Sequence, residues 1–123
     1  LVEEADYSRE SSYAAAQRLL SLTNRPSALF CMDDYKAVSA LSVAMAMHLR
    51  VPEDISIMGH NDYKISTLVY PALTTVHVPL YHLGSNAADL VVQAIRRPEE
   101  PIKNILLPSH IVERDSVASL PRQ

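Results

Sequence analysis

Several residue types are scarce in this chain of 123 residues, which has one cysteine, two glycines and no tryptophan. Two glycines cannot build the glycine-rich loop that cradles phosphate groups in many nucleotide-binding enzymes. The lone Cys31 lies in an apolar segment, so we expect a packed thiol in a reducing compartment rather than a reactive one. Apolar runs are short and interrupted, and the first residues lack the pattern of a signal peptide. We therefore expect no membrane contact and a cytoplasmic location.

The charge pattern argues against a surface for nucleic acid. The net charge is −3, and the eleven lysines and arginines are scattered instead of forming a stripe. Such a stripe is needed to neutralise DNA phosphates, so any DNA contact must come from another part of the protein. The apolar fraction of 48% is ordinary for a soluble α/β protein with one modest core.

Groups for catalysis or metal binding are equally sparse. The two histidines nearest in sequence, His77 and His82, are separated by an expected strand–helix junction, and no cysteine or carboxylate completes a tetrahedral metal site with them. No serine or cysteine has the surroundings of an activated nucleophile. We therefore expect no metal, no cofactor and no enzymatic activity. His60 either lines a cleft or lies on an exposed loop, the commoner setting for a histidine after a strand.

Apolar periodicity and breaking residues divide the chain into alternating helices and strands. Ser8 is suited to cap the first helix, and Pro52 disfavours helical geometry at Val51, so the second helix must end before it. The expected helices are 9–22, 35–49 and 83–95, the expected strands are 28–32, 55–58, 73–77, 104–107 and 110–114, and 116–123 is expected to be a loose tail. This alternation predicts an α/β fold with a parallel sheet and helices on both faces.

Polar residues follow the buried strand 55–58 at once. Gly59 marks the expected turn, and His60, Asn61 and Asp62 come just past the carboxyl end of the strand. Open α/β sheets bind their ligands at this edge, so these residues are site candidates on position alone. An Asx turn after Gly59 would also explain Asn61 and Asp62.

The same region resembles a known family. Residues 50–59 (RVPEDISIMG), 61–62 (ND) and 71–76 (PALTTV) resemble the lactose/galactose-repressor (LacI/GalR) family of bacterial transcription regulators. Further agreement follows in the right order at 6–13, 26–34, 83–87 and 107–116. The resemblance therefore covers nearly the whole chain.

The resemblance implies part of a type I periplasmic-binding-protein-like fold, in which two lobes enclose a ligand. Residues 1–78 would form an incomplete C-terminal lobe, 79–105 would belong to the N-terminal lobe, and 106–123 would be the closing strand and tail. The chain starts at Leu1 without a methionine, so we expect a fragment that holds half a cleft and binds ligand weakly by itself. The family's helix-turn-helix, which binds operator DNA, would lie upstream.

The resemblance also implies four residues that contact the ligand. Asp33 matches a position that faces the effector, and Asn61 matches an acidic residue that hydrogen-bonds it. Tyr7 matches an aromatic residue that stacks on it, although a tyrosine near the surface is equally expected. Val78 replaces a glutamine that contacts ligand across the cleft. An amide at 61 and an apolar side chain at 78 favour a less polar, hydroxyl-bearing effector over a basic one.

Three carboxylates near this site have structural alternatives. A carboxylate at the start of a helix can cap backbone N–H groups, and one cap is enough. Capping is favoured for Asp34, which the resemblance also implies is the structural acid, while Asp33 is evenly divided between capping and ligand contact. Asp62 is expected to hold its loop.

A dimer contact is implied by the resemblance, because relatives pair through the helix that matches 35–49 and the loop before strand 73–77. The residues expected near the two-fold axis are Val38, Leu41 or Ser42, Met45, Val69 and Tyr70. A helix that is apolar on more than one side fits such an interface, and it fits burial on both faces within the lobe nearly as well.

These expectations describe the effector-sensing, dimer-forming part of a transcription regulator. A small metabolite such as a sugar or nucleoside would bind between two lobes and change operator affinity by favouring one closure state. The alternative is a periplasmic sugar-binding protein of the same fold, which a helix-turn-helix upstream would exclude. An enzyme is a distant third reading.

Overall fold

Two helices begin the chain and cover the sheet. The computed structural model describes residues 1–101 and 103–119. Helix α1 (Arg9–Leu20) starts where the side chain of Ser8 accepts a hydrogen bond from the backbone N–H of Ser11, which confirms the expected cap. Helix α2 (Asp34–Ala46) packs beside α1 and against the sheet.

The end of α2 differs from expectation. The helix stops at Ala46, although Pro52 alone would allow it to continue further. His48 has a left-handed φ of 57°, and a residue in that conformation turns the chain out of the helix. The backbone N–H of Leu49 then bonds back to the carbonyl of Ala44 and closes the helix end.

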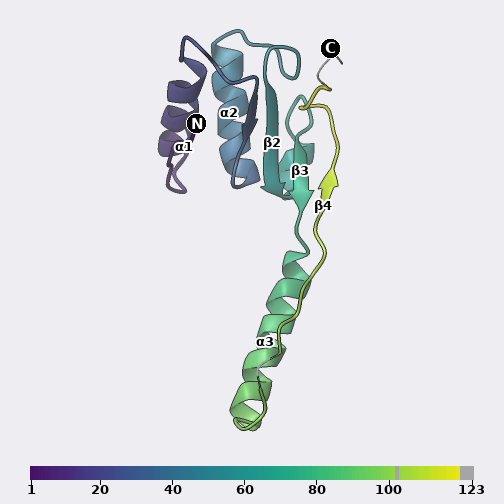
Figure 1. Ribbon diagram of the computed structural model, residues 1–123. Helices are drawn as coiled ribbons and strands as arrows, with labels where there is room; N and C mark the ends of the chain where they lie inside the picture. Colours follow the sequence, from purple (N-terminus) through teal and green to yellow (C-terminus); the bar gives the residue numbers. More distant parts are fainter. Residues whose placement is uncertain (102, 120–123) are drawn as a thin grey trace.

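Four strands form one sheet in the order β1-β2-β3-β4 (Figure 1). They are β1 (Ala28–Phe30), β2 (Ser56–Asn61), β3 (Thr74–His77) and β4 (His110–Val112), with a short 3₁₀ helix η1 (Lys64–Thr67) after β2. The first three strands are parallel, whereas β4 pairs antiparallel with β3. The α/β class is confirmed. The sheet is mixed, because the chain leaves the lobe after β3 and returns as β4 alongside it in the opposite direction.

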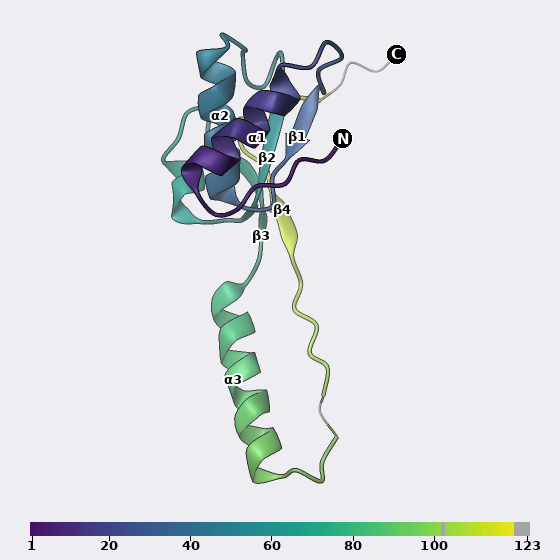
Figure 2. The same cartoon turned by 90° about the vertical axis from the view of Figure 1, so that its left-hand side faces the viewer.

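The core lies between helices α1 and α2 and one face of the sheet. Its buried apolar residues are Ala16, Leu20, Ala37, Ala40, Leu41, Val43, Ala44, Ile55, Ile57 and Leu73. Figure 2 looks through both helices onto the sheet, so α1 and α2 lie on the same side of it. On the opposite side Phe30 and Ile111 remain more than half exposed. Within the described residues, the helical layer covers this one face of the sheet.

Helix α3 (Leu80–Arg96) projects away from this lobe as an arm (Figures 1 and 2). None of its residues is buried, and apolar side chains such as Val91 and Ile95 are exposed. The segment after α3 runs back beside the helix. The prediction of a strand at 104–107 is wrong, because no strand among the described residues lies beside this segment to pair with it. None of the helices in the described ranges is long and apolar enough to cross a bilayer.

The expected loose tail is also wrong at its start. Ser116 is fully buried, and its hydroxyl donates to the Ile57 carbonyl at 2.5 Å and accepts from the Thr74 N–H at 2.9 Å. Its own carbonyl accepts from the Ile57 N–H at 2.8 Å. Ser116 thus joins β2 to β3 where the two strands begin. The remainder of the expected tail, 120–123, lies outside the described residues.

Candidate functional site

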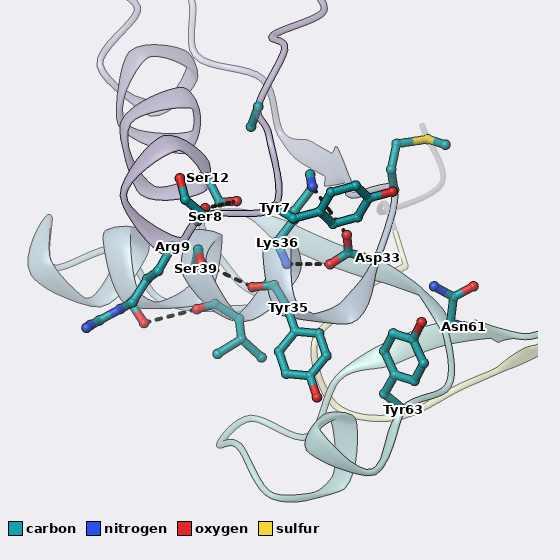
Figure 3. Close-up of a pocket in the computed structure, with 14 residues that line it drawn as sticks. Tyr7, Ser8, Arg9, Ser12, Asp33, Tyr35, Lys36, Ser39, Asn61 and Tyr63 are labelled. Atoms are coloured by element: carbon teal, nitrogen blue, oxygen red, sulfur yellow. Dashed lines mark hydrogen bonds and ion pairs between the residues drawn. The ribbon is translucent and has the colours of Figure 1, made fainter.

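An open hollow of about 790 Å³ lies at the carboxyl ends of β1 and β2 and extends between the starts of α1 and α2. Tyr7, Asp33 and Asn61 line it together (Figure 3). They reach it from three segments: the turn before α1, the turn before α2 and the end of β2. Val78, the fourth expected contact, is not among the lining residues and lies half-buried just past the end of β3.

Asp33, and not Asp34, caps α2. Asp33 has the extended backbone of an N-cap residue, and its side chain accepts a hydrogen bond from the Lys36 N–H at 2.8 Å. Asp34 is already in the helix and is fully buried, so the expectation that it caps is wrong. A carboxylate has several acceptor positions, so capping leaves Asp33 able to accept a further hydrogen bond from a ligand.

Lys36 holds Tyr7 beside the hollow. Its ammonium group donates to the Asp6 carbonyl at 2.9 Å, lies 3.3 Å from an Asp33 oxygen, and lies 4.2 Å from the centre of the Tyr7 ring. The Tyr7 side chain itself is 95% exposed. An exposed aromatic face is suited to stacking on the apolar face of a sugar or on a planar base. Sequence reasoning missed Lys36, although its place three residues after a capping aspartate was a usable signal.

Asn61 enters the hollow because the backbone there is left-handed. Asn61 and Asp62 have φ values of 97° and 55°, a region that asparagine and aspartate tolerate better than other residues with side chains. The expected turn at Gly59 is wrong, since β2 continues to Asn61. His60 is consequently half-buried in a strand instead of lying on an exposed loop, and its ring meets that of Phe30 edge-on at 6.3 Å.

Two further tyrosines stand at the hollow and were not expected. The rings of Tyr35 and Tyr63 lie 5.5 Å apart, and both residues line the hollow (Figure 3). Tyr35 is in the first turn of α2, where an aromatic residue gives no local sequence signal for a binding site. The place of Tyr63 depends on the left-handed backbone just before it, which a sequence pattern does not predict.

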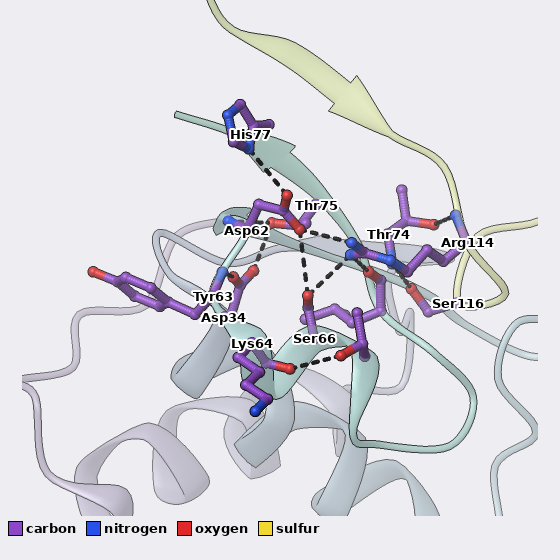
Figure 4. A network of polar contacts seen from close by, with 12 residues as sticks. Asp34, Asp62, Tyr63, Lys64, Ser66, Thr74, Thr75, His77, Arg114 and Ser116 are labelled. Atoms are coloured by element: carbon purple, nitrogen blue, oxygen red, sulfur yellow. Dashed lines mark hydrogen bonds and ion pairs between the residues drawn. The ribbon is translucent and has the colours of Figure 1, made fainter. Parts of the chain in front are cut away.

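Asp34 is buried next to the hollow and holds the surrounding elements together. Its carboxylate accepts hydrogen bonds from the Thr75 hydroxyl at 2.5 Å and from the Tyr63 N–H at 2.6 Å (Figure 4). Burial raises the pKa of Asp34 above its ordinary value, and these hydrogen bonds oppose that shift only in part. Asp34 therefore connects α2, β3 and the segment after β2 at the edge where the strands end.

Asp62 does not line the hollow and instead faces the other strands (Figure 4). It lies 2.7 Å from a guanidinium nitrogen of Arg114 and 3.0 Å from Nδ1 of His77. Partial burial pushes the pKa of Asp62 upward, but the hydrogen bonds and positive charge of Arg114, together with His77, outweigh it and leave the pKa below its ordinary value. Arg114 was noted in the sequence only for its resemblance, since its partners lie far from it along the chain.

The residues expected at a dimer axis lie on α2 and in the loop before β3. Met45 and Tyr70 are exposed by 64% and 89%, while Val38, Ser42 and Val69 are half-buried. Leu41 is in the core, so Ser42 is the member of that pair that reaches the surface. Leu68 adds a further exposed apolar side chain to the loop.

The remaining reactive side chains have structural settings. Burial raises the pKa of the Cys31 thiol to about 12, in agreement with a packed rather than a reactive thiol. Within residues 1–101 and 103–119, no group of three or more histidine, cysteine, aspartate or glutamate residues is arranged to hold a metal ion.

Comparisons with known proteins agree on one group. The family model described as periplasmic binding protein-like domain matches residues 1–117. The chain is 38% identical over 120 residues to the HTH-type transcriptional repressor PurR of Salmonella arizonae and to that of Salmonella typhi. The match covers 98% of this chain and 35% of each repressor, so the chain spans about a third of the length of these relatives.

Solved structures give the same answer. A complex of the transcriptional regulator CelR with cellobiose superposes with a TM-score of 0.87 at 30% identity, over 94% of this chain and 36% of the other. A putative LacI transcriptional regulator from Bacillus cereus subsp. cytotoxis also gives 0.87, at 33% identity, over 92% and 40%. A LacI family regulator from Enterococcus faecalis with bound ribose gives 0.85 at 28% identity, over 96% and 43%.

Proposed function

Because this chain belongs to the periplasmic binding protein-like domain family, as an effector-binding domain of the LacI/GalR type, we propose that it senses a small metabolite for a DNA-binding transcription regulator. The observation that supports this most is the hollow at the strand ends, where Tyr7, Asp33 and Asn61 meet. In this proposal the hollow is one wall of a cleft and a second lobe supplies the other.

The exposed arm supports the two-lobe arrangement. Helix α3 has apolar side chains but no buried residue, which is the state of a helix whose packing surface is elsewhere. We assign 79–101 and 103–105 to the second lobe and 1–78 to the first, with the closing strand β4 returning to the first lobe, where it pairs with β3. Half a cleft buries too little of a ligand for tight binding, so the pocket needs both lobes.

The effector that fits this wall is a small polar molecule with a flat or apolar face, such as a sugar or nucleoside. Tyr7 offers a stacking surface, Asp33 offers acceptors, and the Asn61 amide offers both a donor and an acceptor. Cellobiose and ribose are bound by two of the related regulators, which makes sugars the first compounds to test. Val78 lies at the junction with the arm and would meet ligand only after the lobes close.

Signalling would use a shift between closure states. A ligand that binds the closed form more tightly raises its population, and the paired subunits transmit the change to DNA-binding segments upstream of this chain. The proposed contact between two copies is formed by the exposed Met45 and Tyr70 together with the half-buried Val38, Ser42 and Val69. A regulator of this kind would act in the cytoplasm without contacting a membrane.

Two measurements on the full-length protein test this proposal. A thermal-shift screen with cellobiose, ribose, lactose and nucleosides should find a compound that raises the melting temperature, because binding to the native state stabilises it. The same compound should change the affinity of the protein for DNA from its own promoter region. Ligand binding without DNA binding would support the alternative, a periplasmic sugar-binding protein.

A further inference from the structure

We infer that Asp62 is a positioning residue. The chain crosses twice between the lobe and the α3 arm, and the Asp62 carboxylate fixes both crossings to the loop that places Asn61 in the hollow. One crossing leaves the lobe at His77, the last residue of β3, and the other returns through β4 toward Arg114. The two oxygens of the Asp62 carboxylate meet one residue from each crossing. Arg114 Nη2 donates to Oδ1 at 2.7 Å, and His77 Nδ1 lies 3.0 Å from Oδ2 (Figure 4).

Arg114 is held rigidly enough to act as the fixed side of this junction. Its other terminal nitrogen donates to the Leu73 carbonyl at 2.8 Å and to the Ser66 hydroxyl at 2.9 Å. Its backbone N–H donates to the Thr74 hydroxyl at 2.9 Å. The Arg114 side chain is only 17% exposed, so these charge-assisted bonds are largely shielded from water. The guanidinium thus ties the start of β3, η1 and the Asp62 loop to one group.

The two crossings also touch each other beside Asp62. The rings of His77 and His110 lie 4.9 Å apart, and these residues are register partners in the β3–β4 pair. The charged and titratable groups that face Asp62 are therefore Arg114 and His77 directly, with Asp34 nearby on α2 and His110 behind His77. Arg114 and His77, the two residues that lie nearest to the Asp62 carboxylate, belong to the two segments that cross between the lobe and the arm.

On the side of the hollow, Asn61 and Asp62 are consecutive left-handed residues. Such a backbone persists only where its surroundings fix it, and here the Asp62 carboxylate supplies that constraint. A displacement of Asn61 is consequently passed to Asp62 through one peptide bond. This inference rests on the proposed function for its consequence: if Asn61 contacts the effector, Asp62 is the joint between the cleft and the second lobe.

The test measures the direction of the arm without ligand or DNA. In the full-length protein with Cys31→Ala, spin labels on cysteines introduced at the exposed positions Gln17 in α1 and Asp89 in α3 report the distance between lobe and arm. Asp62→Asn should broaden the distance distribution and displace its maximum at an unchanged circular dichroism spectrum. Glu53→Gln, which removes an exposed carboxylate away from the junction, should leave the distribution as in the parent protein.

His77→Gln serves as the second variant, because His77 is more exposed than Arg114 and less important for packing. It should displace the distribution in the same direction by a smaller amount, and this result stands if Asp62→Asn does not fold. Asp62→Glu, which keeps the charge, should restore most of the parent distribution. Distributions in Asp62→Asn or His77→Gln that match the parent would overturn the inference. A failed effector screen would instead reject the proposed function and leave these distances interpretable.

Discussion

Gly59 leaves the space that the carboxylate of Asp34 occupies. A Cβ atom at position 59 would collide with Oδ1 of Asp34 and come within 2.9 Å of a methyl group of Leu73. Both neighbours are buried and cannot move aside cheaply. This close approach explains a glycine in the interior of β2, where it would otherwise weaken the strand.

Gly59→Ala should therefore lower the free energy of unfolding by about 1–3 kcal/mol, the usual cost of forcing extra atoms into a packed core. The matched control is Gly84→Ala in α3, where an added Cβ meets nothing within 4 Å. That change should raise stability by about 0.5–1 kcal/mol, because alanine favours a helix more than glycine does. Urea denaturation measures both. Equal effects of the two substitutions would show that the contact with Asp34 is absent.

Asp34→Asn should be tolerated, since an amide can accept from the Tyr63 N–H and donate to the Thr75 hydroxyl. Asp34→Ala leaves the partly buried Tyr63 N–H without an acceptor and should cost about 1–3 kcal/mol. The folded-state pKa of Asp34 is raised by burial, so the wild type loses stability as pH rises from 3.8 through that higher pKa. The stability of Asp34→Asn relative to wild type should accordingly improve as pH rises and level off above the folded pKa. A difference that does not change with pH would contradict this setting for Asp34.

Asp62 should show the opposite dependence. Its folded pKa is lowered by Arg114 and His77, so its stabilising contribution is complete above the ordinary value of 3.8 and is lost as pH falls through the lower folded pKa. Asp62→Asn should cost about 1.5–3 kcal/mol near neutral pH, the range for hydrogen bonds to charged groups. The gap between variant and wild type should persist to about pH 5 and narrow below pH 4. Denaturation curves across this pH range measure the difference in free energy of unfolding between variant and wild type. A difference that has already disappeared above pH 5 would mean that Asp62 is not paired as described.

The features that sequence reasoning predicted correctly depend on neighbours in the chain. Ser8 caps α1 through a contact three residues away, and the first three strands follow from short apolar runs between breakers. The features that it missed depend on distant partners. Ser116 was assigned to a loose tail because its bond to Ile57 spans 59 residues. The cap of α2 was assigned to Asp34 instead of Asp33, because that choice depends on which residue first adopts helical geometry.

The proposed contact between two copies can be tested by charge. Val38→Asp combined with Tyr70→Asp would place like charges against each other across a two-fold axis, and the full-length protein should become monomeric in sedimentation while keeping its fold. Leu22→Asp introduces a similar charge at an exposed apolar position near the end of α1, away from this surface, and should leave the dimer intact. A double variant that still sediments as a dimer would place the interface elsewhere.

The central claim is that the hollow of Tyr7, Asp33 and Asn61 is the effector site, and calorimetry on the full-length protein tests it most directly. The titrant is the sugar or nucleoside that raises the melting temperature in the screen. Asn61→Ala should weaken binding about tenfold or more, the equivalent of a lost hydrogen bond of about 1.4 kcal/mol. Asn24→Ala, at an exposed position after α1, should bind as the wild type does. An effector that binds Asn61→Ala with wild-type affinity would show that the site lies elsewhere.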